Sequence, residues 1–159
     1  MNGGTGKCPE CGALPDAGEA CDERFHACLV LDFSDQAYGA VHHLVVATYM
    51  LQHPSRLTAE GWLATRTLLQ AFLHEGRTPA AVRREDRRLL DSGARSIKLK
   101  NRAAAPVVRP RSWPATIADV RRESSEAYCA GVTRWATAAL AAALDMALEG
   151  ADRGEYRGE

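Results

Sequence analysis

Apolar residues recur at helical spacing along most of this chain, and no strand pattern is strong enough to support a sheet. We expect helices over roughly residues 21–33, 36–52, 58–76, 78–92 and 116–150, with Ser124 as a place where the last region could divide. A chain of 159 residues is long enough to bury its own core. The expected fold is therefore all-α, a bundle of about five helices with an N-terminal zinc-binding Cys loop.

The segment 36–52 is the one expected at the centre of the bundle. It is apolar on more than one side, whereas residues 83–90 show the one-sided pattern of a surface helix. The residue before a proline avoids the helical region, so this helix should stop ahead of Pro54. The apolar residues on its several faces are Val41, Leu44, Val45, Val46, Tyr49, Met50 and Leu51.

Other parts of the chain divide it into three regions. Residues 1–20 form a Cys-rich metal-binding loop, 21–150 the helical bundle and 151–159 a charged, flexible tail. Within the bundle, residues 94–114 contain three prolines and are expected to be an exposed connection. This connection could be partly extended at 96–99 and 107–108, or a poorly ordered loop.

A short cysteine motif near the N-terminus indicates a metal site. Cys8 and Cys11 are separated by two residues, one of them Pro9, and are followed by Gly12, a spacing that forms a tight turn with both thiolates aimed at one ion. A redox pair of the thioredoxin type has the same spacing but follows a buried strand. No such strand precedes Cys8, so metal binding is favoured over free or redox thiols.

Cys21 is the expected third ligand, and the remaining cysteines are expected to be buried core thiols. Cys28 lies on the same predicted helix as Cys21, about 10 Å further along its axis. That separation is too large for two sulfurs that must each lie about 2.3 Å from one zinc ion. Cys129 stands alone in the last helical region.

Two histidines compete for the fourth position. His42 and His53 stand about 16 Å apart on one continuous helix and cannot bind the same ion. If the first two helices pack antiparallel, His53 lies near Cys21, and His42 lies near Cys28 with Asp32 as a plausible partner. His53 is the first choice and His42 the alternative, and an outside group or water remains open. Tyr49 and Gln52 would then support the ligands.

Charge and composition exclude several classes of protein. Lys plus Arg and Asp plus Glu are 20 each, so nothing favours nucleic acid or an anionic membrane overall. The basic residues of the middle third lack interleaved aromatics and fit a solvated face. Neither a signal peptide nor a membrane span is recognisable. We expect a cytoplasmic protein whose cysteines are ligands and core thiols rather than disulfides.

Several motifs resemble an uncharacterised family of small bacterial proteins, domain-of-unknown-function family 5946. They are Cys8-Pro9-x-Cys11-Gly12, Cys21 with Phe25, Phe33-Ser34-Asp35-x-x-Tyr38, Val41-His42-x-Leu44-x-Val46-x-x-Tyr49-x-x-Gln52-His53-Pro54, and, more thinly, Trp113-Pro114 and residues 116–120 with Trp135. The resemblance implies no activity. Ala47 stands where the family pattern often has Asp, so any catalysis by that carboxylate would be lost here. Cys28 replaces an ordinary apolar residue.

Two classes of function follow. In the first, four protein ligands close a structural zinc site, and the helical body is a regulatory or protein-interaction module whose partner is another protein. In the second, an open zinc site with a neighbouring histidine or Asp32 makes a small metal-dependent hydrolase or lyase. The first is favoured, because no hydrolase spacing, phosphate loop or nucleophile elbow occurs. Zinc release by thiol oxidation is compatible with it. The oligomeric state, the process and the partner are not predicted.

Overall fold

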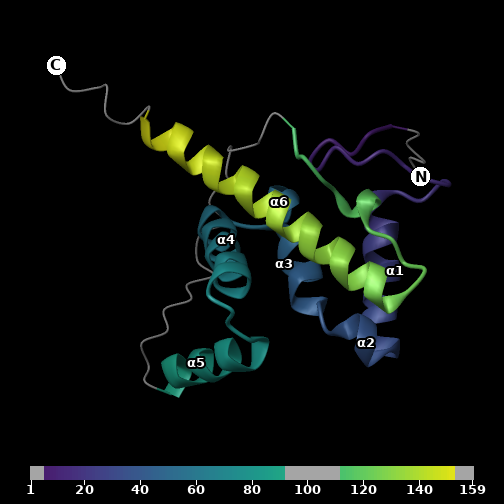
Figure 1. Ribbon diagram of the computed structural model, residues 1–159. Helices are drawn as coiled ribbons and strands as arrows, with labels where there is room; N and C mark the ends of the chain where they lie inside the picture. The colour runs from purple at the N-terminus through teal and green to yellow at the C-terminus, as the bar shows by residue number, and fades with distance from the viewer. Residues whose placement is uncertain (1–5, 92–111, 153–159) are drawn as a thin grey trace.

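The computed structural model describes residues 6–91 and 112–152, and six α-helices account for most of them (Figure 1). The all-α prediction is confirmed, and no strand occurs in the described ranges. The elements are α1 (Cys21–Ser34), α2 (Gln36–Gly39), α3 (His42–Gln52), η1 (Pro54–Arg56), α4 (Ala59–His74), α5 (Pro79–Asp91), η2 (Ile117–Asp119) and α6 (Ser125–Asp152), where η marks a 3-10 helix.

The predicted helix 36–52 is two helices in the structure, which raises the count from five to six. The chain leaves the helical conformation at Val41, with φ −111° and ψ 13°. Gly39 packs so closely on α1 that a Cβ atom there would lie 2.6 Å from the carbonyl oxygen of Asp32. The single turn α2 therefore packs directly against α1, and the break at Val41 redirects the chain into α3. Sequence periodicity did not detect this break because both pieces are helical.

Polar caps set most of the other helix ends. The Thr58 hydroxyl accepts from the N–H of Gly61 at 3.0 Å and begins α4, which closes before Gly76 with φ +62°. Ser124 accepts from the N–H of Ala127 at 3.1 Å and begins α6. The last region thus divides at Ser124, and Thr116 caps only η2. Gly150 does not end α6, which continues to Asp152.

Helix α3 is the centre of the fold, as its apolar pattern predicted. It packs against α1, α4 and α6, and α6, the longest element, runs across α3 and also contacts α2 and α4 (Figure 1). Val45 and Leu51 of α3 are completely buried. One buried stripe of α6 faces this core and includes the predicted residues Tyr128, Val132, Trp135, Ala139, Ala143 and Met146, and Ala136 and Leu140 are buried with them.

Buried polar side chains lock α3 to its neighbours. The amide of Gln52, which is fully buried, accepts from the indole N–H of Trp135 at 3.0 Å and donates to the carbonyl of Ala115 at 2.8 Å. The indole N–H of Trp62 donates to the carbonyl of Leu51 at 3.0 Å. These bonds fix the C-terminal end of α3, because the Gln52 amide and the two indole N–H groups each have a specific partner.

Some predictions fall on residues outside the described ranges. They concern the connection 94–114, of which only residues 112–114 are described, with its extended segments 96–99 and 107–108, and the tail 151–159 apart from residues 151–152. The division into a Cys-rich loop, a bundle and a tail stays a prediction. Among the described residues, no helix is long and apolar enough to cross a lipid bilayer.

Candidate metal centre

Four side chains from separate parts of the chain meet at one point beside the bundle. The donor atoms of Cys8, Cys11, Cys21 and His53 all lie within 4.8 Å of one another. The Nε2 atom of His53 lies 3.7 Å from the Sγ of Cys8 and 3.6 Å from the Sγ of Cys21. Ligands of a tetrahedral zinc site with three sulfurs and one nitrogen stand about 3.5 to 3.8 Å from each other, given zinc–ligand bonds of about 2.0 to 2.3 Å. The donor set and its spacing therefore fit a metal ion.

The first two thiols are placed by the tight turn that their spacing predicted. The N–H of Gly12 donates to the carbonyl of Cys8 at 2.9 Å, and the N–H of Cys8 donates to the carbonyl of Ala13 at 2.9 Å. Gly12 has φ +81°, a left-handed conformation that favours glycine. The Sγ of Cys11 accepts from the N–H of Ala13 at 3.4 Å, a bond that stabilises negative charge on sulfur.

The third and fourth donors sit at helix ends that meet because α1 and α3 run antiparallel. Cys21 is the first residue of α1, and His53 directly follows the last residue of α3. The Nδ1 atom of His53 lies 2.6 Å from the carbonyl oxygen of Tyr49, one turn earlier. This bond places the proton on Nδ1, so the lone pair of Nε2 points at the thiols. A helix-terminal carbonyl thus sets the tautomer that a metal requires.

The pKa values of two of the thiols and of the imidazole are shifted from their usual values, and the two thiols are shifted in opposite directions. Hydrogen bonds from Cys11 and then from His53 hold the pKa of Cys21 well below its usual range. The pKa of Cys11 is raised, first by its hydrogen bond to Cys21 and then by burial. Burial would lower the pKa of His53, but hydrogen bonds with Cys21 and with the Tyr49 carbonyl raise it. A cation that takes the place of these protons would hold all three sulfurs as thiolates.

The rings of Tyr49 and Phe25 stack in a column against the imidazole of His53, and the sequence did not indicate this stacking. The ring of Tyr49 stacks on His53 with centroids 4.0 Å apart and on Phe25 with centroids 3.9 Å apart. The guanidinium carbon of Arg56 lies 5.4 Å from the centroid of the Tyr49 ring. The position of Phe25, one turn after Cys21 on α1, was the available signal for it. Tyr49 supports the site through its carbonyl and its ring.

Gln52 was expected to support the ligands, but its side chain bonds elsewhere. Its amide bonds Trp135 and Ala115 and so belongs to the packing of α3 on the rest of the bundle. The neighbouring positions Gln52 and His53 point to different surroundings because the chain leaves the helix between them.

His42, the alternative fourth ligand, lies at the opposite end of α3 from the four donors. Its Nδ1 lies 2.9 Å from Oδ2 of Asp32, the partner expected from the antiparallel packing. The hydroxyl of Tyr128 donates to Oδ1 of the same carboxylate at 2.8 Å. The Asp32 side chain is 1% exposed, so both of its oxygens are satisfied inside the protein. Nothing in the sequence linked Tyr128 to Asp32.

The two remaining cysteines lie apart from the four donors. Cys28 is 2% exposed and is the buried core thiol that was predicted, and burial raises its pKa. Cys129 was also predicted to be buried, but it is only partly covered, and its thiol donates to the carbonyl of Ala37 at 3.3 Å. The short helix α2 leaves this position of α6 at the margin of the core.

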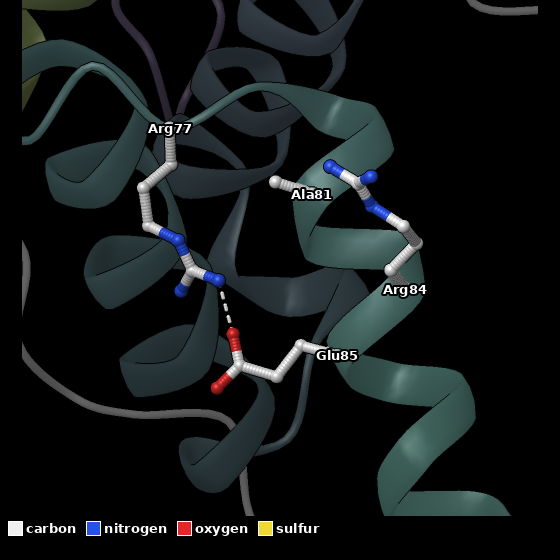
Figure 2. A pocket seen from close by; sticks show the side chains of 4 residues that line it. All are labelled: Arg77, Ala81, Arg84 and Glu85. Carbon is white, nitrogen blue, oxygen red and sulfur yellow. Dashed lines mark hydrogen bonds and ion pairs between the residues drawn. The ribbon is translucent and has the colours of Figure 1, made fainter.

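A cavity of about 440 Å³ lies beside α5 and away from the four donors (Figure 2). It is lined by Arg77, Ala81, Arg84 and Glu85, and Arg77 forms an ion pair with Glu85 across it. None of Cys8, Cys11, Cys21 and His53 lines this cavity. It therefore does not provide a substrate pocket at the candidate metal centre.

Comparison with known proteins identifies a family for this chain. A family described as a family of unknown function (DUF5946) matches residues 6–143, which include all four donors. No curated protein and no solved structure matches the chain.

Proposed function

Because the chain belongs to DUF5946, a family of unknown function, we propose a function from the site itself: the protein binds one zinc ion through Cys8, Cys11, Cys21 and His53. The observation that carries this proposal is the mutual spacing of the four donors, which suits the edges of a zinc tetrahedron. Thiolate and imidazole ligands in a four-coordinate arrangement favour zinc over hard cations such as calcium and magnesium.

We propose that this site is structural. The chain supplies four donors, so a tetrahedral ion bound by all of them has no position left for water or substrate. Cys11 and His53 are only 1% and 3% exposed. When bound, the ion would join the N-terminal turn to the ends of α1 and α3. Its contribution is a cross-link between segments that are distant in sequence.

The hydrolase or lyase reading requires a group that moves protons beside the metal. The pair that could do so, Asp32 and His42, lies at the other end of α3 from His53. The length of α3 separates the two histidines by about 16 Å at the rise of an α-helix. The separation favours the structural reading over an enzyme with an open zinc site.

We propose that the helical body is a regulatory or protein-interaction module of the cytoplasm, with another protein as its partner. The zero net charge gives no general attraction to nucleic acid or to an anionic membrane. Val30 and Phe33 on α1 are 67% and 78% exposed. Large apolar side chains exposed close together on one helix are typical of surfaces that contact other proteins.

Metal analysis of the purified, reduced protein tests the zinc proposal. We expect about one zinc per chain, and replacement of zinc by cobalt should give the intense visible bands of a tetrahedral thiolate site. Cys11→Ser and His53→Ala should lose the metal, and His42→Ala should keep it. Reduced protein without a transition metal would refute the proposal. A metal site that survives His53→Ala, with an oxygen ligand seen by X-ray absorption, would support the open site.

A further inference from the structure

The four donors differ in their access to solvent. Cys8 and Cys21 are partly exposed, whereas Cys11 and His53 are buried. The Sγ of Cys11 also accepts the N–H of Ala13, which keeps this thiol on the inner side of the turn. A small oxidant arriving from solvent would therefore reach Cys8 and Cys21 before Cys11.

The N-terminal segment is attached to the bundle in two different ways. The turn 16–19 is held by ion pairs: Arg24, which is 8% exposed, lies 3.7 Å from Asp16 and 3.6 Å from Glu19. Arg122 lies 2.6 Å from the same carboxylate oxygen of Glu19. None of these contacts involves sulfur, so they do not depend on the redox state of the cysteines.

The turn 8–13 has fewer attachments that are independent of sulfur. Its carboxylate, Glu10, accepts the N–H of Ser55 at 2.9 Å in an exposed contact. Its other described polar contact with the bundle runs through the sulfur of Cys8, one of the four donors, and Ala13, which is 5% exposed, buries one methyl group. An exposed hydrogen bond contributes only about 1 kcal/mol and one buried methyl group about as much, so a metal ion shared by the four donors would dominate the attachment of this turn.

We propose that the centre is a peroxide-sensitive switch, in which Cys8 and Cys21 join in a disulfide, the zinc ion is released, and Cys11 and His53 are no longer held together by it. This inference rests on the proposed zinc binding. The two sulfurs lie within 4.8 Å of each other, so a shift of the turn brings them to the disulfide length of about 2.05 Å. Only Cys11 and His53 would then remain as donors, and two ligands do not hold a structural zinc ion.

The reaction uses hydrogen peroxide as its oxidant. One thiolate, that of Cys21 or Cys8, attacks a peroxide oxygen, the O–O bond breaks, and a sulfenic acid and hydroxide form. The second thiolate attacks the sulfenic sulfur, forms the S–S bond and expels a second hydroxide. Two thiolates have lost two electrons in total, and the peroxide has accepted both. Thiol reductants reverse the reaction and restore the ligands.

The switch would change the surface at the C-terminal end of α3 and leave the rest of the bundle intact. Release of the ion leaves Nε2 of His53, beside the Tyr49 ring, without its metal partner, and it loosens residues 9–13, which the disulfide holds only at Cys8. The turn 16–19 stays attached through Arg24 and Arg122, and the disulfide still ties the chain to the start of α1. A partner could therefore distinguish the oxidised from the reduced protein by the surface around the C-terminal end of α3.

Treatment of the zinc-loaded, reduced full chain with hydrogen peroxide tests this inference. We expect loss of the bound zinc, followed with a chromophoric chelator, and mass spectrometry should find Cys8 linked to Cys21 with Cys11 still free for alkylation. Hydrogen exchange should rise in residues 8–13 and 50–56 but not in α6. Dithiothreitol with zinc should reverse all three changes.

Matched controls separate this inference from the zinc proposal. The double variant Cys28→Ala, Cys129→Ser keeps all four donors and should release zinc as the wild type does. Retention of zinc under peroxide, a Cys8–Cys11 disulfide, or release that depends on Cys28 or Cys129 would each overturn the switch and leave zinc binding intact. Absence of zinc from the reduced protein before oxidation would instead refute the proposed function.

Discussion

The two ends of α3 each present a histidine, and the two histidines are held in opposite ways. His42 bonds a buried carboxylate of α1, which in turn bonds Tyr128 of α6. His53 bonds a carbonyl of its own helix and turns its other nitrogen to thiols of the N-terminal segment. The first end is complete with protein groups alone, whereas the second offers four donors to an ion. The same residue type thus takes part in internal packing at one end of α3 and offers a metal ligand at the other.

A charge buried in α3 between the two histidines should have the largest effect, because it disrupts the packing of the whole helix. Val45 is completely buried in α3. Val45→Asp should cost on the order of 5 kcal/mol, comparable with the whole stability of a small domain, and leave the chain unfolded. Circular dichroism and denaturant titration measure this. Arg84→Glu on the exposed side of α5 is the control and should be tolerated. A folded Val45→Asp protein would show that α3 is not the core.

Removal of the metal should affect only the C-terminal end of α3. With free zinc at about a thousand times its Kd, chelation should lower the free energy of unfolding by about 4 kcal/mol. His42→Ala should show the same chelator effect, and His53→Ala should show none, because it has no bound metal to lose. Denaturant titration with and without chelator gives both values. Helical circular dichroism should largely persist after chelation, and its collapse would mean that the ion holds the whole fold.

Loss of the Asp32 carboxylate should affect only the N-terminal end of α3. Asp32→Ala leaves the buried Tyr128 hydroxyl and the Nδ1 of His42 without their acceptor, at a cost of about 3 kcal/mol. Tyr128→Phe removes one hydrogen bond of the same network and should cost about 1 to 2 kcal/mol. Zinc content should be unchanged in both variants. Loss of zinc from Asp32→Ala would show that the two ends are coupled.

The smallest expected effect is a pH dependence from His43, beside His42. Burial, and then the neighbouring His42, lower the pKa of His43 below its usual value. The unfolded chain therefore binds a proton more readily than the folded protein, and this contribution to stability, present above about pH 6.5, decreases as the pH falls. His43→Gln should show a shallower loss of stability between about pH 7 and 5 than the wild type. Equal slopes would contradict the prediction.

The sequence was sufficient for the features that depend on local spacing. Periodicity predicted the helices and the central place of α3, and the tight Cys turn predicted two neighbouring thiols. The antiparallel packing of α1 and α3 correctly placed His53 beside Cys21 and His42 beside Asp32. Ligation of a metal by these residues stays a prediction.

Features that depend on contacts between distant segments could not be read from spacing. The break at Val41 follows from the close packing of Gly39 on Asp32, which no periodic pattern records. The bond from Trp135 to Gln52 joins residues 83 positions apart, so Gln52 could not be separated from the metal site beforehand. Cys129 is partly exposed because the short helix α2 covers it incompletely, which also depends on tertiary structure.

The positions of the four donors along the chain also affect the order in which the protein can assemble during synthesis. All four are present once residue 53 has left the ribosome, whereas the partners Tyr128 and Trp135 that fix α3 from the other side belong to α6. The chain is synthesised from its N-terminus, so the segment with the four donors emerges before α6 does. A zinc ion bound at that stage would hold α1 and α3 antiparallel before α6 exists, so the nascent chain would offer α6 a surface that is already formed.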